Sequence, residues 1–349
     1  MRGAATRRVT STRRVSFIQD LASVQPILRL REQQLEVWNL AAQACASPSP
    51  RTRIRLRRDH PMHPTAPEWF LDAIQCRSQS CFVEVDGCPI HYQHWTNSGA
   101  PALVLIHGYA AHSHWWDVIA PQLLDRYQVV ALDLSGCGDS GHRAHYSLER
   151  FAREVAAVAE HAELPMPFGV VAHSFGGGVA LKTAGQMPKA LAGLVLVDSA
   201  VVRPPTSGGR RRSIGALPPV LFHDRDTALE RFRLVPPQPC ANRFLLHHIA
   251  SHSLRAAEGG WTWKTDPRFL ANFVGEDQTD TLMQLQTRLA VLYGSLSTSF
   301  RTDVREYMAY VAPAETEFVA VAGAHHHVFL DQPIAFCNQL KTTLAPWWG

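Results

Sequence analysis

A serine stands at the point where an apolar segment gives way to a run of small residues. Residues 170–178 read VVAHSFGGG, with Ser174 between Ala172 and Gly176. This small-x-Ser-x-Gly pattern is typical of a sharp strand-to-helix turn, which needs small neighbours and exposes the serine hydroxyl. The helix that follows points its positive dipole end at the hydroxyl and favours developing negative charge. We therefore predict that Ser174 is a nucleophile.

A serine hydroxyl needs a general base, and a histidine-rich segment near the end of the chain offers one. Residues 323–333 read GAHHHVFLDQP. Three adjacent histidines also suggest a metal site, as do His112, His114 and the pair 247–248. Adjacent side chains on one loop point apart, however, which does not suit tetrahedral coordination. We therefore expect no bound metal and no cofactor.

Two further motifs precede the serine: residues 105–109 read LIHGY, and residues 133–140 read DLSGCGDS. Together with the serine turn and the histidine segment they follow the order of the α/β-hydrolase superfamily. Residues 81–344 resemble its serine hydrolase and esterase branch. That branch usually has Gly two residues before the serine, where this chain has Ala172. We interpret the second motif as a tight structural turn.

The resemblance also identifies the base. In the superfamily it follows the last strand, within Gly-x-Gly-His and ahead of an acidic-x-Pro sequence. Matching Gly323 at one end and residues 331–333 (DQP) at the other points to His326, with His325 as the alternative.

The orienting acid departs from the family pattern. Gly-x-x-Asp is expected after the seventh strand, but residues 294–297 read GSLS. A second location for the acid lies just after the sixth strand, where this chain has Asp198. A buried carboxylate there would hold the tautomer and charge of the imidazole. We expect Asp198 to be the acid, with Asp303 as the second candidate.

The resemblance further implies an oxyanion hole made by the backbone N–H groups of Tyr109 and Phe175. Trp115 and Trp116, which follow the His-Gly loop, and His173 are predicted to contact substrate. The expected lid adds aromatic residues that either line an apolar pocket or form the lid's own core: Phe222, Phe232, Phe244, Trp261, Trp263, Phe269 and Phe273.

From residue 81 onward, short β-rich segments alternate with helical patterns, as in a mostly parallel sheet covered on both faces. Together with the resemblance this predicts an α/β-hydrolase fold: eight strands, helices on both faces and a helical lid inserted after strand 6. We divide the chain into a basic N-terminal extension (1–64), a first core part (65–198), the lid (199–288) and a second core part (289–349). The expected strands are 81–85, 90–95, 102–107, 128–133, 168–173, 191–198, 289–294 and 317–323; the expected helices are 113–124, 147–163, 175–187, 302–311 and 328–343.

Charge and cysteine content narrow the function classes. The chain of 349 residues has a net charge of +4, but residues 1–60 alone hold twelve Arg against four acidic residues. The rest is slightly acidic, so no nucleic-acid partner is expected. The seven cysteines never form C-x-x-C, and no stretch is apolar enough to span a membrane. We expect a cytoplasmic protein, and its oligomeric state stays open.

The expected activity is hydrolysis of a carboxylic ester, lactone or thioester of a small to medium apolar substrate through an acyl-enzyme. Two alternatives stay open. The same site in relatives cleaves carbon–carbon bonds or performs cofactor-free perhydrolysis, and a non-enzymatic ligand receptor would explain the serine in the acid's usual place.

Overall fold

The computed structural model describes residues 66–204 and 219–348. The predicted N-terminal extension, residues 1–64, lies outside these residues. Within the described part of the chain, no helix is long and apolar enough to cross a membrane.

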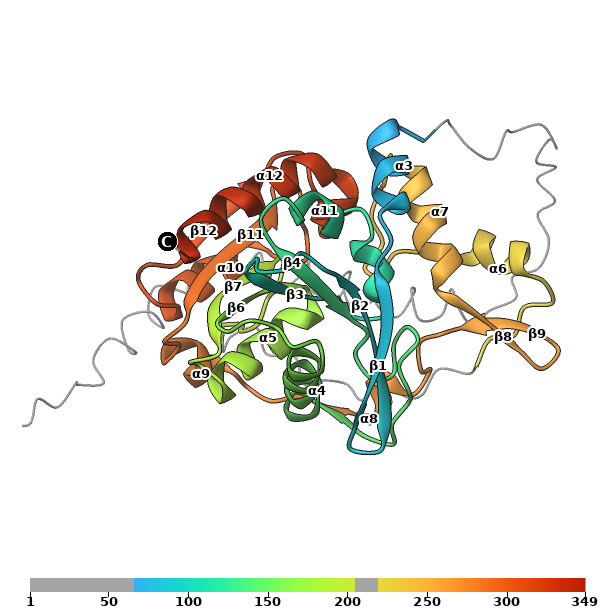
Figure 1. Cartoon of the computed structure of the whole chain (residues 1–349), viewed down its shortest axis with the longest axis horizontal. Helices are drawn as coiled ribbons and strands as arrows, with labels where there is room; N and C mark the ends of the chain where they lie inside the picture. Colours follow the sequence, from blue (N-terminus) through green and yellow to red (C-terminus); the bar gives the residue numbers. More distant parts are fainter. Residues whose placement is uncertain (1–65, 205–218, 349) are drawn as a thin grey trace, which may run out of the picture. The chain divides into compact units, whose positions relative to one another are not determined.

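One eight-stranded sheet forms the centre of the described fold (Figure 1). Its order is β1-β2-β4-β3-β6-β7-β11-β12. Strands β1 and β2 pair antiparallel, as do β2 and β4, and the remaining neighbours are parallel. The strands are β1 Gln79–Val85, β2 Cys88–Trp95, β3 Ala102–Ile106, β4 Gln128–Leu132, β6 Phe168–His173, β7 Leu191–Val197, β11 Arg288–Gly294 and β12 Glu317–Val321.

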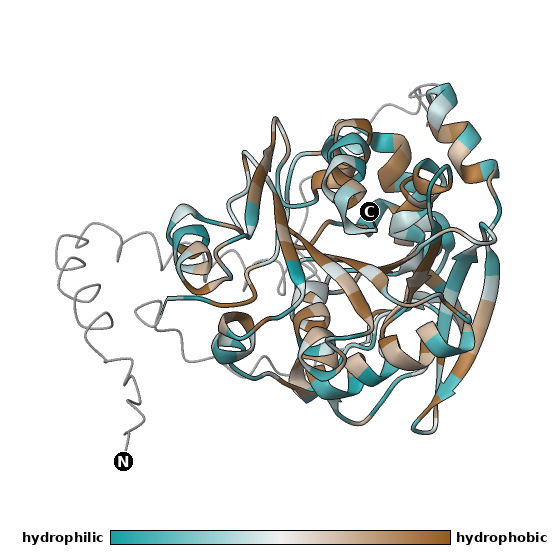
Figure 2. Cartoon of the chain, turned by 60° about the vertical axis from the view of Figure 1, so that its left-hand side comes forward, coloured by the Kyte–Doolittle hydropathy of each residue, from teal (hydrophilic) through white to brown (hydrophobic). Residues whose placement is uncertain are grey.

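All eight expected strands are present, because buried parallel strands are easy to recognise as continuous apolar segments. Every residue of β3 (ALVLI) and of β6 (FGVVAH) is buried. The strands are accordingly among the most hydrophobic ribbons in Figure 2. The expected β1–β2 hairpin turns through Asp86 and Gly87, which both have positive φ (48° and 72°), as a tight two-residue hairpin requires.

Helices cover both faces of the sheet, and each face has its own hydrophobic cluster. One cluster is built with α4 (Leu148–His161), α5 (Phe175–Gln186) and α10 (Thr302–Val311). The other is built with elements from both ends of the described chain: α3 (Glu68–Gln75), the 3₁₀ turns η3 (Ser113–Trp116) and η4 (Ala120–Leu123), α11 (Val328–Asp331), α12 (Pro333–Leu344) and the final turn η6 (Ala345–Trp347).

Two of the expected helices differ in the structure. The segment 328–343 is not one helix: α11 ends at Asp331 and α12 starts at Pro333, because proline disfavours helical geometry in the residue before it. Gln332 accordingly has φ −131° and ψ 60°. The segment 113–124 forms the two short turns η3 and η4 instead of a continuous helix. The Ser147 cap of α4 is formed as expected, since its hydroxyl accepts the Arg150 N–H.

Between β7 and β11 the chain leaves the alternating pattern, and we call residues 219–287 of this segment the insertion. The insertion is not wholly helical, because an antiparallel hairpin, β8 with β9, follows its longest helix. A two-residue strand of the insertion, β10, pairs with β5 (Tyr146–Ser147) of the core. The elements are α6 Arg225–Arg231, α7 Arg243–His252, β8 Leu254–Ala257, β9 Gly260–Trp263, α8 Phe269–Asn272, β10 Phe273–Val274 and α9 Thr279–Met283.

Candidate active site

Ser174 occupies the turn between β6 and α5 in a backbone conformation that non-glycine residues rarely adopt, with φ 51° and ψ −114°. Such strained positions persist only where the surrounding structure enforces them. Here close packing does so: a side chain on Gly176 would come within 2.6 Å of the His107 carbonyl oxygen. The small residue predicted after the serine is therefore required by the approach of β3.

Ser174, His326 and Asp198 form one chain of hydrogen bonds. The Ser174 Oγ lies 2.9 Å from His326 Nε2, and His326 Nδ1 lies 2.7 Å from Asp198 Oδ1. The imidazole and the carboxylate are buried, whereas the serine is partly exposed. The structure therefore brings together three side chains that are up to 152 positions apart.

Asp198 directly follows β7 and accepts two further hydrogen bonds. The Gly294 N–H donates to Oδ2 at 2.9 Å, and the Ser297 hydroxyl donates to Oδ1 at 2.7 Å. Ser297 is the residue that replaces the acid expected after the seventh strand. Because β7 and β11 are neighbours in the sheet, Asp198 and Ser297 lie side by side.

His325 and Asp303, the alternative candidates for the base and the acid, contact other partners. The ring Nδ1 and the backbone N–H of His325 both contact Asp331 Oδ2, at 3.0 Å and 2.7 Å. Asp303 forms an ion pair with Arg301 at 3.0 Å in the first turn of α10.

The loop after β3 is oriented by the buried His107. Its Nε2 accepts the Leu134 N–H at 3.0 Å, so its Nδ1–H donates to the Gly108 carbonyl oxygen at 2.7 Å. In a trans peptide the next N–H, that of Tyr109, points away from this carbonyl. Phe175 is the first residue of α5, where N–H groups have no acceptor within the helix. One predicted oxyanion donor thus lies in the loop after β3, and the other lies at the start of α5.

Three predicted substrate contacts are packed inside the protein instead. The ring of Trp116 is fully buried and lies 4.6 Å from Phe329, centroid to centroid, in the cluster with η3 and α11. Trp115 is buried in the same cluster. His173 lies 1 % exposed beneath the site, and its Nε2 contacts the His326 carbonyl oxygen at 3.1 Å. The three side chains are therefore buried in this structure, and substrate contact by them stays a prediction.

Burial is the main reason why His173 stays uncharged. It lowers the pKa of His173 well below the usual value, and the neighbouring His326 and His327 lower it further. A neutral ring donates one N–H, and here that N–H goes to the carbonyl of the His326 residue. His173 thereby connects the serine turn to the loop that carries the imidazole.

The glycine-rich loop after β4 is a structural turn, as we interpreted it. The carboxylate of its first residue, Asp133, accepts the backbone N–H groups of Ser113 and Asp139, at 2.5 Å and 2.8 Å. Ser140 Oγ donates to the Asp133 carbonyl at 2.6 Å. These bonds hold the loop against η3.

The aromatic residues of the insertion separate into two groups. Phe222 and Phe232 pack around Trp263 within the insertion, and Phe244 packs on Phe70 of α3. Phe269 and Phe273 instead reach Phe175, with ring centroids 5.6 Å and 5.1 Å away. Phe269 also lies 5.6 Å from the ring of Tyr109. The insertion therefore contacts the two residues whose N–H groups are the predicted oxyanion donors.

The chain belongs to the α/β-hydrolase fold family, whose sequence profile matches residues 101–333. Among curated relatives, a pimeloyl-[acyl-carrier protein] methyl ester esterase of Sodalis glossinidius is 30% identical over 70% of this chain and 94% of its own. The same-named esterase of Vibrio vulnificus is 28% identical over 71% and 96%. Among solved structures, the thioesterase domain of the curacin biosynthetic pathway has a TM-score of 0.64 at 24% identity, covering 75% of this chain and 99% of that one.

Proposed function

We propose that this protein is a serine hydrolase that cleaves a carboxylic ester through an acyl-enzyme. The observation that carries the proposal is the unbroken hydrogen-bonded chain from Ser174 through His326 to Asp198, with the serine on a strained turn before a helix. Two relatives named as methyl ester esterases support the same bond type. The position of Asp198 beside His326 also supports the hydrolase over the receptor alternative, which rested on the missing acid at residue 297.

In the proposed mechanism Ser174 Oγ attacks the ester carbonyl carbon while His326 Nε2 takes its proton. The imidazolium then protonates the leaving alkoxide, and the acyl group stays on the serine. Water repeats the sequence with His326 again as base, which releases the carboxylic acid. Asp198 stabilises the imidazolium, and each N–H donor of the oxyanion hole (Tyr109, Phe175) contributes about 3 kcal/mol to the transition state.

The proposed substrate has a small to medium apolar acyl group. Phe273 of the insertion packs on Phe175, and both side chains are partly exposed, so an acyl group entering beside them would meet aromatic surface. We propose that the insertion acts as a lid on this side of Ser174. We also propose a cytoplasmic location, because the six described cysteines are free thiols, as in a reducing compartment.

The test is labelling by a fluorophosphonate probe, followed by turnover of p-nitrophenyl esters of rising acyl length. Ser174→Ala should abolish both. The chain offers a matched control in Ser80, whose Oγ lies 2.9 Å from His91 Nε2, while His91 Nδ1 lies 2.8 Å from Asp133. This second Ser-His-Asp arrangement has similar distances, but Ser80 lies within β1 and not before a helix.

Ser80→Ala should therefore leave labelling and turnover unchanged, because an activated hydroxyl also needs donors for the developing oxyanion. Loss of labelling in Ser80→Ala, with labelling kept in Ser174→Ala, would identify Ser80 on the edge strand β1 as the nucleophile. Folded wild-type protein that neither reacts with the probe nor hydrolyses any ester would refute the proposal and favour a ligand receptor.

A further inference from the structure

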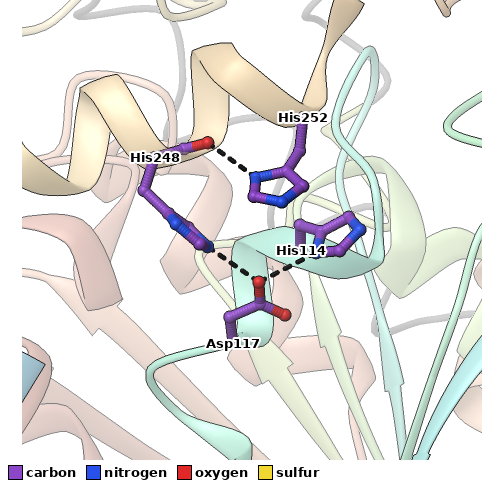
Figure 3. Close-up of side chains that lie close together, drawn as sticks. All are labelled: His114, Asp117, His248 and His252. Atoms are coloured by element: carbon purple, nitrogen blue, oxygen red, sulfur yellow. Dashed lines mark hydrogen bonds and ion pairs between the residues drawn. The ribbon is translucent and has the colours of Figure 1, made fainter. Parts of the chain in front are cut away.

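A second group of ionisable side chains lies outside the triad, where the insertion packs on the core. His248 and His252 come from α7, and His114 and Asp117 come from η3 and the residue that follows it. One possible ligand atom from each of the four lies within 4.8 Å of all the others. In Figure 3 the two histidines of α7 face the short helical turn that carries the other two side chains.

Local geometry explains why the four side chains meet. His248 and His252 are four residues apart on α7 and so project from one face of the helix. His114 and Asp117 are three residues apart at a 3₁₀ turn, where residues of that spacing are aligned. The two elements are held together by hydrophobic packing in one cluster, and by a hydrogen bond of 2.9 Å between His112 Nε2 and Ser253 Oγ.

The hydrogen bonds in the group converge on one carboxylate oxygen. Asp117 Oδ2 lies 2.8 Å from His114 Nδ1 and 2.7 Å from His248 Nε2. The other oxygen, Oδ1, accepts a hydrogen bond from Gln93 Nε2 at 3.1 Å. His252 Nδ1 lies 2.9 Å from the His248 carbonyl oxygen, which can only accept, so its Nε2 carries the lone pair. The hydrogen bond from Gln93 to Asp117 and the one from His252 to the His248 carbonyl are of the kind that orients metal ligands.

We propose that these four side chains bind a divalent transition metal, for which Zn²⁺ is the best match. Three imidazoles and one carboxylate are a zinc ligand set, whereas Ca²⁺ and Mg²⁺ prefer oxygen ligands throughout. Zinc–ligand bonds of about 2.0–2.2 Å require ligand atoms roughly 3.4 Å apart, which is within a small side-chain adjustment of the present arrangement. The inference is independent of the proposed esterase activity.

Metal binding would replace the hydrogen bonds to Asp117. His114 Nδ1 and His248 Nε2 each carry the proton that the carboxylate accepts, and each would bind the ion after its proton moves to the other ring nitrogen. The side chains of His114, Asp117 and His248 are 20%, 12% and 15% exposed, which leaves a route for an ion from solvent.

Two other clusters in the described chain are less suitable. His173, His326 and His327 are all buried, and both ring nitrogens of His326 belong to the triad. The group of His91, Asp133 and Asp139 contains one histidine, whose two nitrogens already contact Ser80 and Asp133. The η3–α7 group is the one in which four ligands from two elements share a partly open position.

With four protein ligands, the proposed site is a closed, structural one. It would fasten α7 of the insertion to η3, which follows the loop of Tyr109 by a few residues. Zinc should therefore stabilise the fold and should not take part in the reaction at Ser174.

The test uses the full chain without a histidine tag, stripped with a chelator and titrated with Zn²⁺. We expect one ion per chain from this site and a rise in Tm of about 5 °C at 100-fold excess over Kd. Even outer partners of a metal site are worth about 10–100-fold in affinity, so His252→Gln and Asp117→Asn should each weaken binding at least ~100-fold. The matched control is His223→Gln, because the His223 side chain is 98% exposed and outside the group.

Two further measurements separate the outcomes. Co²⁺ should give the intense visible bands of a tetrahedral site in wild type and in His326→Gln, but not in His252→Gln. If the variants of α7 or η3 misfold, Gln93→Ala should still fold and weaken binding by about 10–100-fold. Binding that is lost in His326→Gln and kept in His252→Gln would assign the ion to the triad histidines. That result, or absence of binding, would overturn the proposal.

Discussion

The exchange of Asp198 for asparagine tests the placement of the acid most directly. Asp198 Oδ1 receives both His326 Nδ1–H and the Ser297 hydroxyl, and Oδ2 receives the Gly294 N–H. An asparagine side chain has one oxygen and one NH₂ group. If the NH₂ replaces Oδ2, it faces another N–H donor; if it replaces Oδ1, it donates to His326 Nδ1. Ser297 can rotate to accept, so the second orientation is favoured.

In that orientation His326 carries its proton on Nε2 and cannot accept one from Ser174. The same exchange in a serine protease triad lowers kcat by about 10⁴. We expect a loss of about 10³–10⁴ here, which corresponds to roughly 4–5.5 kcal/mol of barrier. The effect should appear in kcat, because the carboxylate lies behind the imidazole and does not face the substrate.

The assay is kcat for a p-nitrophenyl ester, normalised to the fraction of folded protein. Asp303→Asn is the control and should stay within twofold of wild type, since Asp303 pairs with Arg301 on α10. The double variant Asp198→Asn/Ser297→Asp moves the carboxylate to the neighbouring strand end and should recover at least tenfold over Asp198→Asn. Turnover of Asp198→Asn within tenfold of wild type would refute the assignment.

Three predictions concern stability. Gly176→Ala should lower the free energy of unfolding by about 1–3 kcal/mol in urea, because its Cβ would meet a backbone oxygen at 2.6 Å that has little room to move. Arg143→Met should cost about 3–5 kcal/mol, since Glu154, buried and 3.1 Å away, loses its partner; Arg143→Met/Glu154→Leu should recover most of this. Burial would raise the pKa of Asp133, but hydrogen bonding and charge from neighbouring histidines lower it below the reference value of 3.8. Its stabilisation is therefore complete above pH 3.8 and lost as pH falls further, and Asp133→Asn should flatten this acid limb of stability, measured by urea unfolding across pH.

The sheet could be predicted from the sequence because its strands are buried on both faces. Segments such as 102–106 and 191–197 have few polar residues, so their length and position are evident. The insertion could not be predicted in the same way. Its hairpin strands have four residues each, too short for a periodic pattern, and 260–263 (GWTW) is only partly buried.

Motif order was sufficient to select Ser174 and His326, whose positions are tied to strand ends. The support of Asp198 by Ser297 was not predictable, because it depends on β7 and β11 being neighbours. Burial of Trp115 and Trp116 likewise depends on packing by α11. His248 and His252 are four residues apart, a helical spacing that is visible in the sequence but that we did not use in predicting the site.

Asp198 is the first residue after β7, where the chain leaves the sheet toward the insertion. The hydroxyl of the next residue, Ser199, donates to the Ser174 carbonyl oxygen. At the far end of the insertion Gln278 donates to the Gly178 carbonyl on α5, at 3.1 Å. Both junctions of the segment are thus anchored to the serine turn and its helix. If the insertion were exchanged for another sequence, we expect the serine turn to keep its geometry only when the exchanged segment begins after residue 200 and ends before Gln278.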